Sequence, residues 1–130
     1  MDKTKRGALA KLAIAWIATV LLTLIFVPAG WAKFSDHSGW AIAFRHWGYP
    51  TWFRILIGVL ELGGVGLLLT GRWAVAGAAA IIVVMLGGMG THVAFDGGRH
   101  MTSEVVPLVL ASVVLWMRIW RMRGLRAEPV

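Results

Sequence analysis

The chain has 130 residues, of which 58% are hydrophobic and 15% are charged, and its formal net charge is +7. A soluble domain of this length needs more polar surface than this composition provides, so we predict an integral membrane protein. The chain contains no cysteine, which excludes disulfides, thiol relays and thiolate metal sites within it.

Four apolar segments are long enough to be considered as membrane spans. They occupy residues 12–33, 53–71, 73–95 and 104–120. About 20 apolar residues in a helix cross the hydrocarbon core. The fourth has the shortest uncharged run, but Arg118 can extend to the headgroups and Trp116 and Trp120 suit the interface. We therefore predict an all-α fold, a four-helix transmembrane bundle that forms a single domain over residues 1–130.

The distribution of basic residues predicts the orientation of this bundle. If the four spans alternate, nine of the 13 Lys and Arg residues fall on the side of both termini: Lys3, Lys5, Arg6, Lys11, Arg72, Arg118, Arg121, Arg123 and Arg126. The other side holds Lys33, Arg45, Arg54 and Arg99. The positive-inside rule then predicts cytoplasmic termini in a bacterial-type inner membrane. Topology and contact with anionic lipid explain the net charge, so we expect no nucleic-acid partner.

The start of the chain also resembles a cleaved signal peptide, because basic residues precede an apolar run. That run is too long for a signal peptide, so we expect the first span to be retained.

The longest connection between spans, residues 35–51, is rich in aromatic residues. If residues 38–47 are helical, Trp40, Phe44 and Trp47 share one face and the basic side chains lie opposite. This pattern is typical of a short helix that lies in the outer interface. Its aromatic face either anchors the loop in the aromatic belt of the membrane or covers a substrate site as a lid. Both alternatives predict an ordered loop.

An acidic residue interrupts the second span. Glu61 lies near the middle of this span, where a carboxylate costs roughly 3 kcal/mol or more. Such a residue usually belongs to a buried ion pair, a proton site or a ligand pocket. Pairing with Lys33 or Arg54 to fix the helix register is as well supported as a ligand or proton role.

Alternating helix directions bring ionisable groups from all four spans into the outer half of the bundle. The candidate ligand-binding residues are Glu61, Lys33, His92, Arg54 and Glu104. We expect Glu61 and Lys33 to share an outward-facing polar pocket, with His92 in direct or water-bridged contact with Glu61.

Glycines in the second and third spans predict close helix packing, because small residues let helix backbones approach. They are Gly63, Gly64, Gly66, Gly87, Gly88 and Gly90.

Other kinds of site receive less support from the sequence. His92, Asp96 and His100 recur at intervals of four, but Gly97 and Gly98 interrupt the helix that would align them, so we expect no metal site. We expect no haem held by two transmembrane histidines, because only His92 lies within a predicted span. Glu104 also suits the N-terminal end of its own helix, which is the structural alternative for this residue. No nucleophile–base pair, phosphate loop or dinucleotide motif is present, and catalytic residues stay unassigned.

Several motifs together resemble the DoxX family of small four-helix integral membrane proteins. They are FVPAGWAKF, WGYP, IGVLELGGVGLLL, GGMGTH and MTSEVVP, in that order. The resemblance covers residues 14–120, and Gly30, Lys33 and Glu61 match positions typical of the family.

The family takes its name from a subunit associated with a thiosulfate:quinone oxidoreductase of the respiratory membrane. The resemblance implies a membrane subunit of an oxidoreductase system, which binds a quinone or other lipophilic small molecule and no covalent cofactor. A redox subunit or a second copy of the chain are the implied protein partners. The alternative is a non-enzymatic lipid-binding or assembly protein whose buried charges are structural. The sequence leaves open whether the chain is itself an enzyme.

Overall fold

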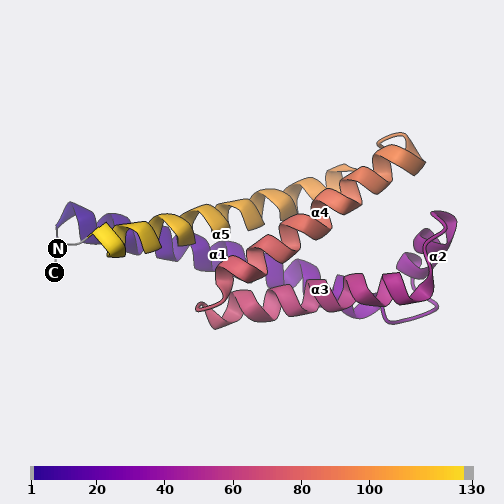
Figure 1. Cartoon of the computed structure of the whole chain (residues 1–130), viewed down its shortest axis with the longest axis horizontal. Helices are drawn as coiled ribbons and strands as arrows, with labels where there is room; N and C mark the ends of the chain where they lie inside the picture. Colours follow the sequence, from indigo (N-terminus) through magenta and orange to yellow (C-terminus); the bar gives the residue numbers. More distant parts are fainter. Residues whose placement is uncertain (1, 128–130) are drawn as a thin grey trace.

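The computed structural model describes the backbone of residues 2–127 and the side chains of residues 2–123. The described residues form five α-helices and no strand (Figure 1). In chain order they are α1 (Lys3–Ala32), α2 (Gly39–His46), α3 (Thr51–Thr70), α4 (Ala74–Asp96) and α5 (Thr102–Ala127). All except α2 are long and apolar enough to cross a membrane. The predicted all-α bundle with four spans is therefore confirmed.

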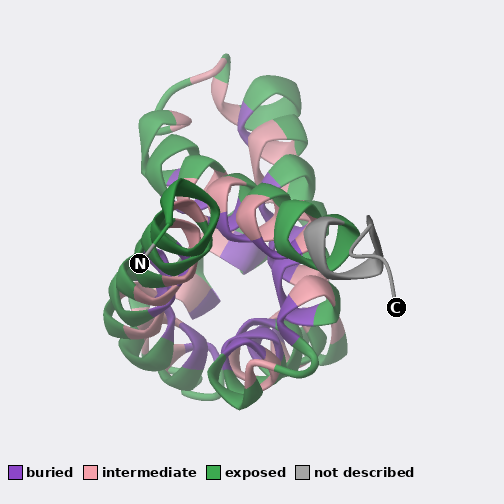
Figure 2. Ribbon diagram, turned by 90° about the vertical axis from the view of Figure 1, so that its left-hand side faces the viewer, coloured by how far each residue is buried: buried purple, intermediate pink, exposed green. Residues whose placement is uncertain are grey.

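The four long helices form a ring in which each one packs against two neighbours. Helix α1 lies against α3 and α5, and α4 also lies against α3 and α5. Seen along the bundle, the buried segments face the centre of this ring and the exposed segments face outward (Figure 2). The outward side chains are mostly hydrophobic, whereas buried polar groups such as Lys33, Glu61 and His92 lie inside. This arrangement suits contact with lipid on the outside.

Two glycine pairs determine how closely the helices cross. A Cβ atom added at Gly77 of α4 would lie 2.5 Å from the carbonyl oxygen of Gly64 on α3. A Cβ atom at Gly58 of α3 would lie 3.0 Å from the carbonyl oxygen of Gly30 on α1. Helix α3 therefore approaches α4 and α1 with almost no side chain between the backbones.

The prediction that most glycines of the second and third spans pack closely was wrong. Of the six predicted positions, Gly64 and Gly88 contact neighbouring helices. The other four, Gly63, Gly66, Gly87 and Gly90, have no neighbouring atom within 4 Å of an added Cβ. They lie on helix faces turned away from the contacts, because the rotation of each helix leaves only one side against its neighbour.

Helices α3 and α4 diverge from their crossing. They are joined by a tight turn at Gly71, cross at Gly64 and Gly77, and separate toward the end of the bundle that carries α2 (Figure 1). We call that end the outer end. In the outer half of the bundle, side chains of both helices line a cavity.

Helix α2 confirms the predicted short helix of the first long connection. Ser38 caps it, since its hydroxyl oxygen accepts a hydrogen bond from the backbone N–H of Ala41 at 3.2 Å. Phe44 is buried and its ring lies 5.5 Å from that of Trp47, whereas Ile42 points outward and is 61% exposed. The aromatic face of α2 is thus turned toward the bundle interior, which is the orientation that the lid alternative predicts.

Candidate functional site

The outer half of the bundle encloses a cavity of about 570 Å³. Small-molecule sites typically measure about 300–1,000 Å³ and are mainly apolar with a few polar groups. Aromatic side chains from α2 and the following turn form one wall of this cavity, and α1, α3, α4 and α5 form the others. Its polar and aromatic lining comprises Phe26, Lys33, Trp40, Phe44, Trp47, Tyr49, Phe53, Glu61, Thr91, His92, Ser103 and Glu104.

One wall carries a buried ion pair between α1 and α3. The ammonium nitrogen of Lys33 lies 2.8 Å from Oε2 of Glu61, and each side chain is only 3% exposed. The same ammonium lies 3.8 Å from the centre of the Trp40 ring. The close crossing of Gly30 and Gly58 brings the two helices near enough for this contact. The Lys33–Glu61 contact predicted from the sequence is therefore present.

The second carboxylate oxygen of Glu61 is not used by the pair. Among the residues that the structure describes, no group donates a hydrogen bond to Oε1 of Glu61, and Glu61 lies on the cavity wall. A carboxylate can accept several hydrogen bonds. Glu61 therefore offers an acceptor to a donor inside the cavity while Lys33 compensates its charge.

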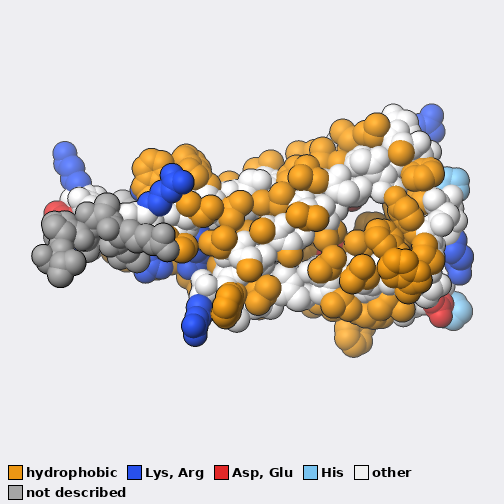
Figure 3. All heavy atoms as spheres, in the orientation of Figure 1, with side chains coloured by type: hydrophobic (Ala, Val, Ile, Leu, Met, Phe, Trp, Pro, Cys, Tyr) orange, Lys and Arg blue, Asp and Glu red, His pale blue; other side chains and the backbone are white. Residues whose placement is uncertain are grey.

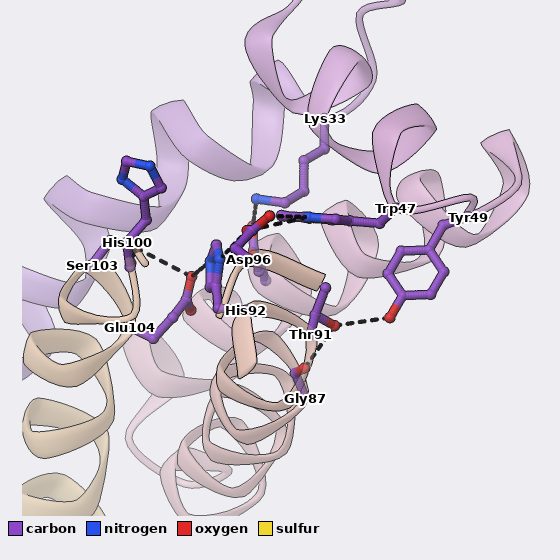
Figure 4. Close-up of polar contacts among 11 residues, drawn as sticks. Lys33, Trp47, Tyr49, Gly87, Thr91, His92, Asp96, His100, Ser103 and Glu104 are labelled. Atoms are coloured by element: carbon purple, nitrogen blue, oxygen red, sulfur yellow. Dashed lines mark hydrogen bonds and ion pairs between the residues drawn. The ribbon is translucent and has the colours of Figure 1, made fainter. Parts of the chain in front are cut away.

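The opposite wall carries a histidine held between two carboxylates (Figure 4). Nδ1 of His92 lies 2.9 Å from Oδ2 of Asp96, and Nε2 lies 3.7 Å from Oε1 of Glu104. Asp96 also accepts a hydrogen bond of 3.3 Å from the indole N–H of Trp47. A carboxylate only accepts hydrogen bonds, so Nδ1 of His92 carries a proton and donates a hydrogen bond to Asp96. This bond orients the ring so that Nε2 points toward Glu104.

The direct contact predicted between His92 and Glu61 is absent among the described side chains. Asp96 lies one turn after His92 on α4 and fixes the imidazole. The water-bridged version of this contact stays a prediction. His92 and Glu61 nevertheless line the same cavity.

Glu104 lies where α5 meets α4. Its carboxylate packs against Gly88, where an added Cβ would lie 3.0 Å from Oε2. Ser103 is 3.5 Å from its Oε1. Glu104 therefore lies beside His92 on the same wall of the cavity, and its place in the first turn of α5 also suits the helix dipole.

Arg54 lies outside the cavity wall, unlike the other candidate residues. Its Nε donates a 2.9 Å hydrogen bond to the carbonyl oxygen of Lys33, and its guanidinium pairs with Asp36. Arg54 thereby caps the end of α1. The hydrogen bond from Arg54 and its charge lower the pKa of the exposed Asp36 carboxyl.

The described side chains contain no group of three His, Cys, Asp or Glu residues placed to hold a metal ion. Helix α4 ends at Asp96, and Gly97 and Gly98 both have positive φ. His100 therefore does not continue the helix face that carries His92 and Asp96.

The sequence did not predict several contacts of this site, and two of them differ in how far the sequence indicated them. The hydroxyl groups of Tyr49 and Thr91 lie 2.8 Å apart and join the turn after α2 to α4. No pattern in the sequence indicated this pair. The other contact, between His92 and Asp96, was detectable, because residues four apart on a helix share a face.

A ring of four helices long and apolar enough to span a membrane, around a cavity with buried charges, defines a small multi-pass membrane protein with an internal cavity. The chain belongs to the DoxX-like family, whose model matches residues 17–114. It is also similar to the uncharacterized protein YdgD of Bacillus subtilis (strain 168), with 31% identity over 109 residues. The match covers 82% of this chain and 95% of YdgD. No solved structure matches the chain.

Proposed function

We propose that this protein binds a quinone, or a lipophilic small molecule with a similar polar ring, as the membrane component of an oxidoreductase system. The observation that carries the proposal is the outer cavity, which combines aromatic walls with two polar clusters. Lys33, Glu61 and His92 line this cavity among mainly apolar side chains, and the partly exposed Asp96 pairs with His92.

These groups suit a ring that carries carbonyl or hydroxyl oxygens. Lys33 is a donor, Oε1 of Glu61 is an acceptor, and His92 can exchange a proton through Nε2. When bound, a quinone supplies two-electron redox chemistry. The aromatic side chains of the cavity would hold such a ring, and Glu61 and His92 would be the proton-exchanging groups beside it, while a partner redox subunit would supply the electrons.

A non-enzymatic role in lipid binding or assembly is the second candidate. Its support comes from the contacts of Lys33, which pairs with Glu61 and lies over the Trp40 ring. In this alternative, the sole role of the pair is to fix the register of α1 against α3.

Ligand binding distinguishes the two candidates. Trp40 and Trp47 line the cavity, so decylubiquinone should quench tryptophan fluorescence saturably in nanodiscs that hold the purified protein. Loss of one hydrogen bond to a charged group costs about 1.5–3 kcal/mol, so Glu61→Gln should weaken binding by roughly 10- to 100-fold. Asp36→Asn is the control, because this carboxylate is exposed and lies outside the cavity.

Two results decide against the quinone. Quenching that never saturates, with only phospholipid extracted from the purified protein, supports the accessory role. If Glu61→Gln binds normally but unfolds more easily, and Lys33→Met restores its stability, the charges are structural.

The proposed location is the bacterial inner membrane with cytoplasmic termini, and its support is the nine-to-four division of the 13 Lys and Arg residues. In intact cells, a membrane-impermeant thiol reagent should label His37→Cys and leave Asp2→Cys unlabelled. The reverse pattern would overturn the orientation.

A further inference from the structure

The cavity has an open side between α3 and α4. Leu56 and Leu60 of α3 and Val83 of α4 line the cavity, yet they are 41%, 37% and 67% exposed. Side chains that are both lining and exposed form a rim. Figure 3 shows the molecule hollowed between α4 and α3, beside α2, with hydrophobic atoms around the hollow.

Glycines explain why this side is open. The crossing of Gly64 and Gly77 holds the inner halves of α3 and α4 together, and the helices then diverge toward the outer end. Gly87 lines the cavity on α4, and an added Cβ there would meet no atom within 4 Å. At Gly87 itself, therefore, no side chain of a neighbouring helix covers the cavity.

The outer end of the same gap is closed. The Tyr49–Thr91 hydrogen bond of 2.8 Å ties the turn after α2 to α4, and the Tyr49 ring lies 6.2 Å from that of Phe95. The opening therefore lies between the Tyr49–Thr91 hydrogen bond and the Gly64–Gly77 crossing, on the side of the bundle. Because α3 and α4 are membrane-spanning, the rim faces the hydrocarbon of the bilayer.

We propose that the cavity opens laterally into the lipid between α3 and α4, and that its ligand is an amphiphile with a single long apolar tail. The polar head lies near Glu61 and His92, and the tail leaves over Gly87, between Leu60 and Val83, into the bilayer. The identity of the head rests on the proposed function. The evidence for the lateral opening is the exposed rim of the cavity and the Tyr49–Thr91 hydrogen bond that closes its outer end.

A membrane-resident alkylating reagent tests the opening directly. The natural chain has no cysteine, so Met85→Cys creates a single thiol on the cavity wall at a position that is only 4% exposed. The probe is a maleimide with a long alkyl chain, incorporated into phosphatidylcholine vesicles that hold the full chain. Its polar head and apolar tail imitate the proposed ligand.

Gly87→Phe should obstruct the opening, whereas Gly90→Phe is the matched control. Gly90 is on the same helix and also has open space around it, but it does not line the cavity. Alkylation of the cysteine should be at least about tenfold slower in Gly87→Phe, a barrier increase of roughly 1.4 kcal/mol. Gly90→Phe should react at the parent rate. Val83→Trp provides a second obstruction at the exposed rim.

The proposal is overturned if both rim variants react as fast as the control. It is also overturned if a charged, water-soluble thiol reagent modifies the cysteine rapidly and independently of Gly87→Phe, since the cavity would then open to the aqueous outer side. This experiment contains no quinone. A failure of decylubiquinone to bind would therefore refute the proposed head group and leave the alkylation result to decide the opening.

Discussion

Removing the lysine of the Lys33–Glu61 pair is expected to destabilise the bundle more than removing the glutamate. The two side chains are 2.8 Å apart and each is 3% exposed, so water compensates neither charge. Breaking a buried pair by removing one partner typically costs about 3–5 kcal/mol. Lys33→Met leaves the Glu61 carboxylate without its donor and should cost this amount.

The opposite substitution leaves the lysine better compensated. In Glu61→Gln the ammonium still lies 3.8 Å from the centre of the Trp40 ring, and a desolvated cation–π contact contributes about 2 kcal/mol. Subtracting this contribution predicts a cost of about 1–3 kcal/mol for Glu61→Gln. The double variant removes both charges, and should be more stable than Lys33→Met alone.

Unfolding by SDS in mixed micelles, followed by far-ultraviolet circular dichroism, measures these differences. Lys5→Met is the control on the same helix, because Lys5 is exposed, and it should change the free energy of unfolding by less than about 0.5 kcal/mol. Equal costs for the two single variants would refute the role of Trp40. Additive costs in the double variant would refute the coupling of the pair.

Three further results are expected. Gly77→Ala should cost at least about 1–3 kcal/mol because its Cβ meets the backbone of α3, whereas Gly66→Ala has open space and should be neutral or stabilising; equal SDS midpoints would contradict the close crossing. The pKa of the Asp36 carboxyl is lowered, so its pair with Arg54 stabilises the fold at pH values above the unfolded pKa of 3.8. This contribution disappears as the pH falls through the pKa of the folded state. Asp36→Asn should remove this part of the acid dependence of unfolding, and an unchanged pH profile would argue against the pair. Backbone amides of α2 should exchange slowly with deuterium in nanodiscs, and rapid exchange throughout this helix would indicate an unstructured loop.

The sequence alone was sufficient for the class of protein, the four spans and the short helix α2. Apolar length and composition determine membrane insertion directly, because the bilayer penalises every unpaired polar group. The Lys33–Glu61 pair was also predictable. A carboxylate in the middle of a span requires compensation, and alternating helix directions bring Lys33 to the right depth.

Apart from the His92–Asp96 pair, whose spacing of four is visible in the sequence, the tertiary structure decided which partners the other polar residues have. Helices α1 and α4 are apolar on nearly every side, so no amphipathic face in the sequence indicates their rotation. The rotation of α4 places Gly77 against the backbone of α3 and leaves Gly87 facing open space. It also places Glu104 beside His92, while Arg54 turns to Asp36 outside the cavity. These choices depend on how backbones fit together at the glycine crossings, and such packing forms only when all four helices are in place.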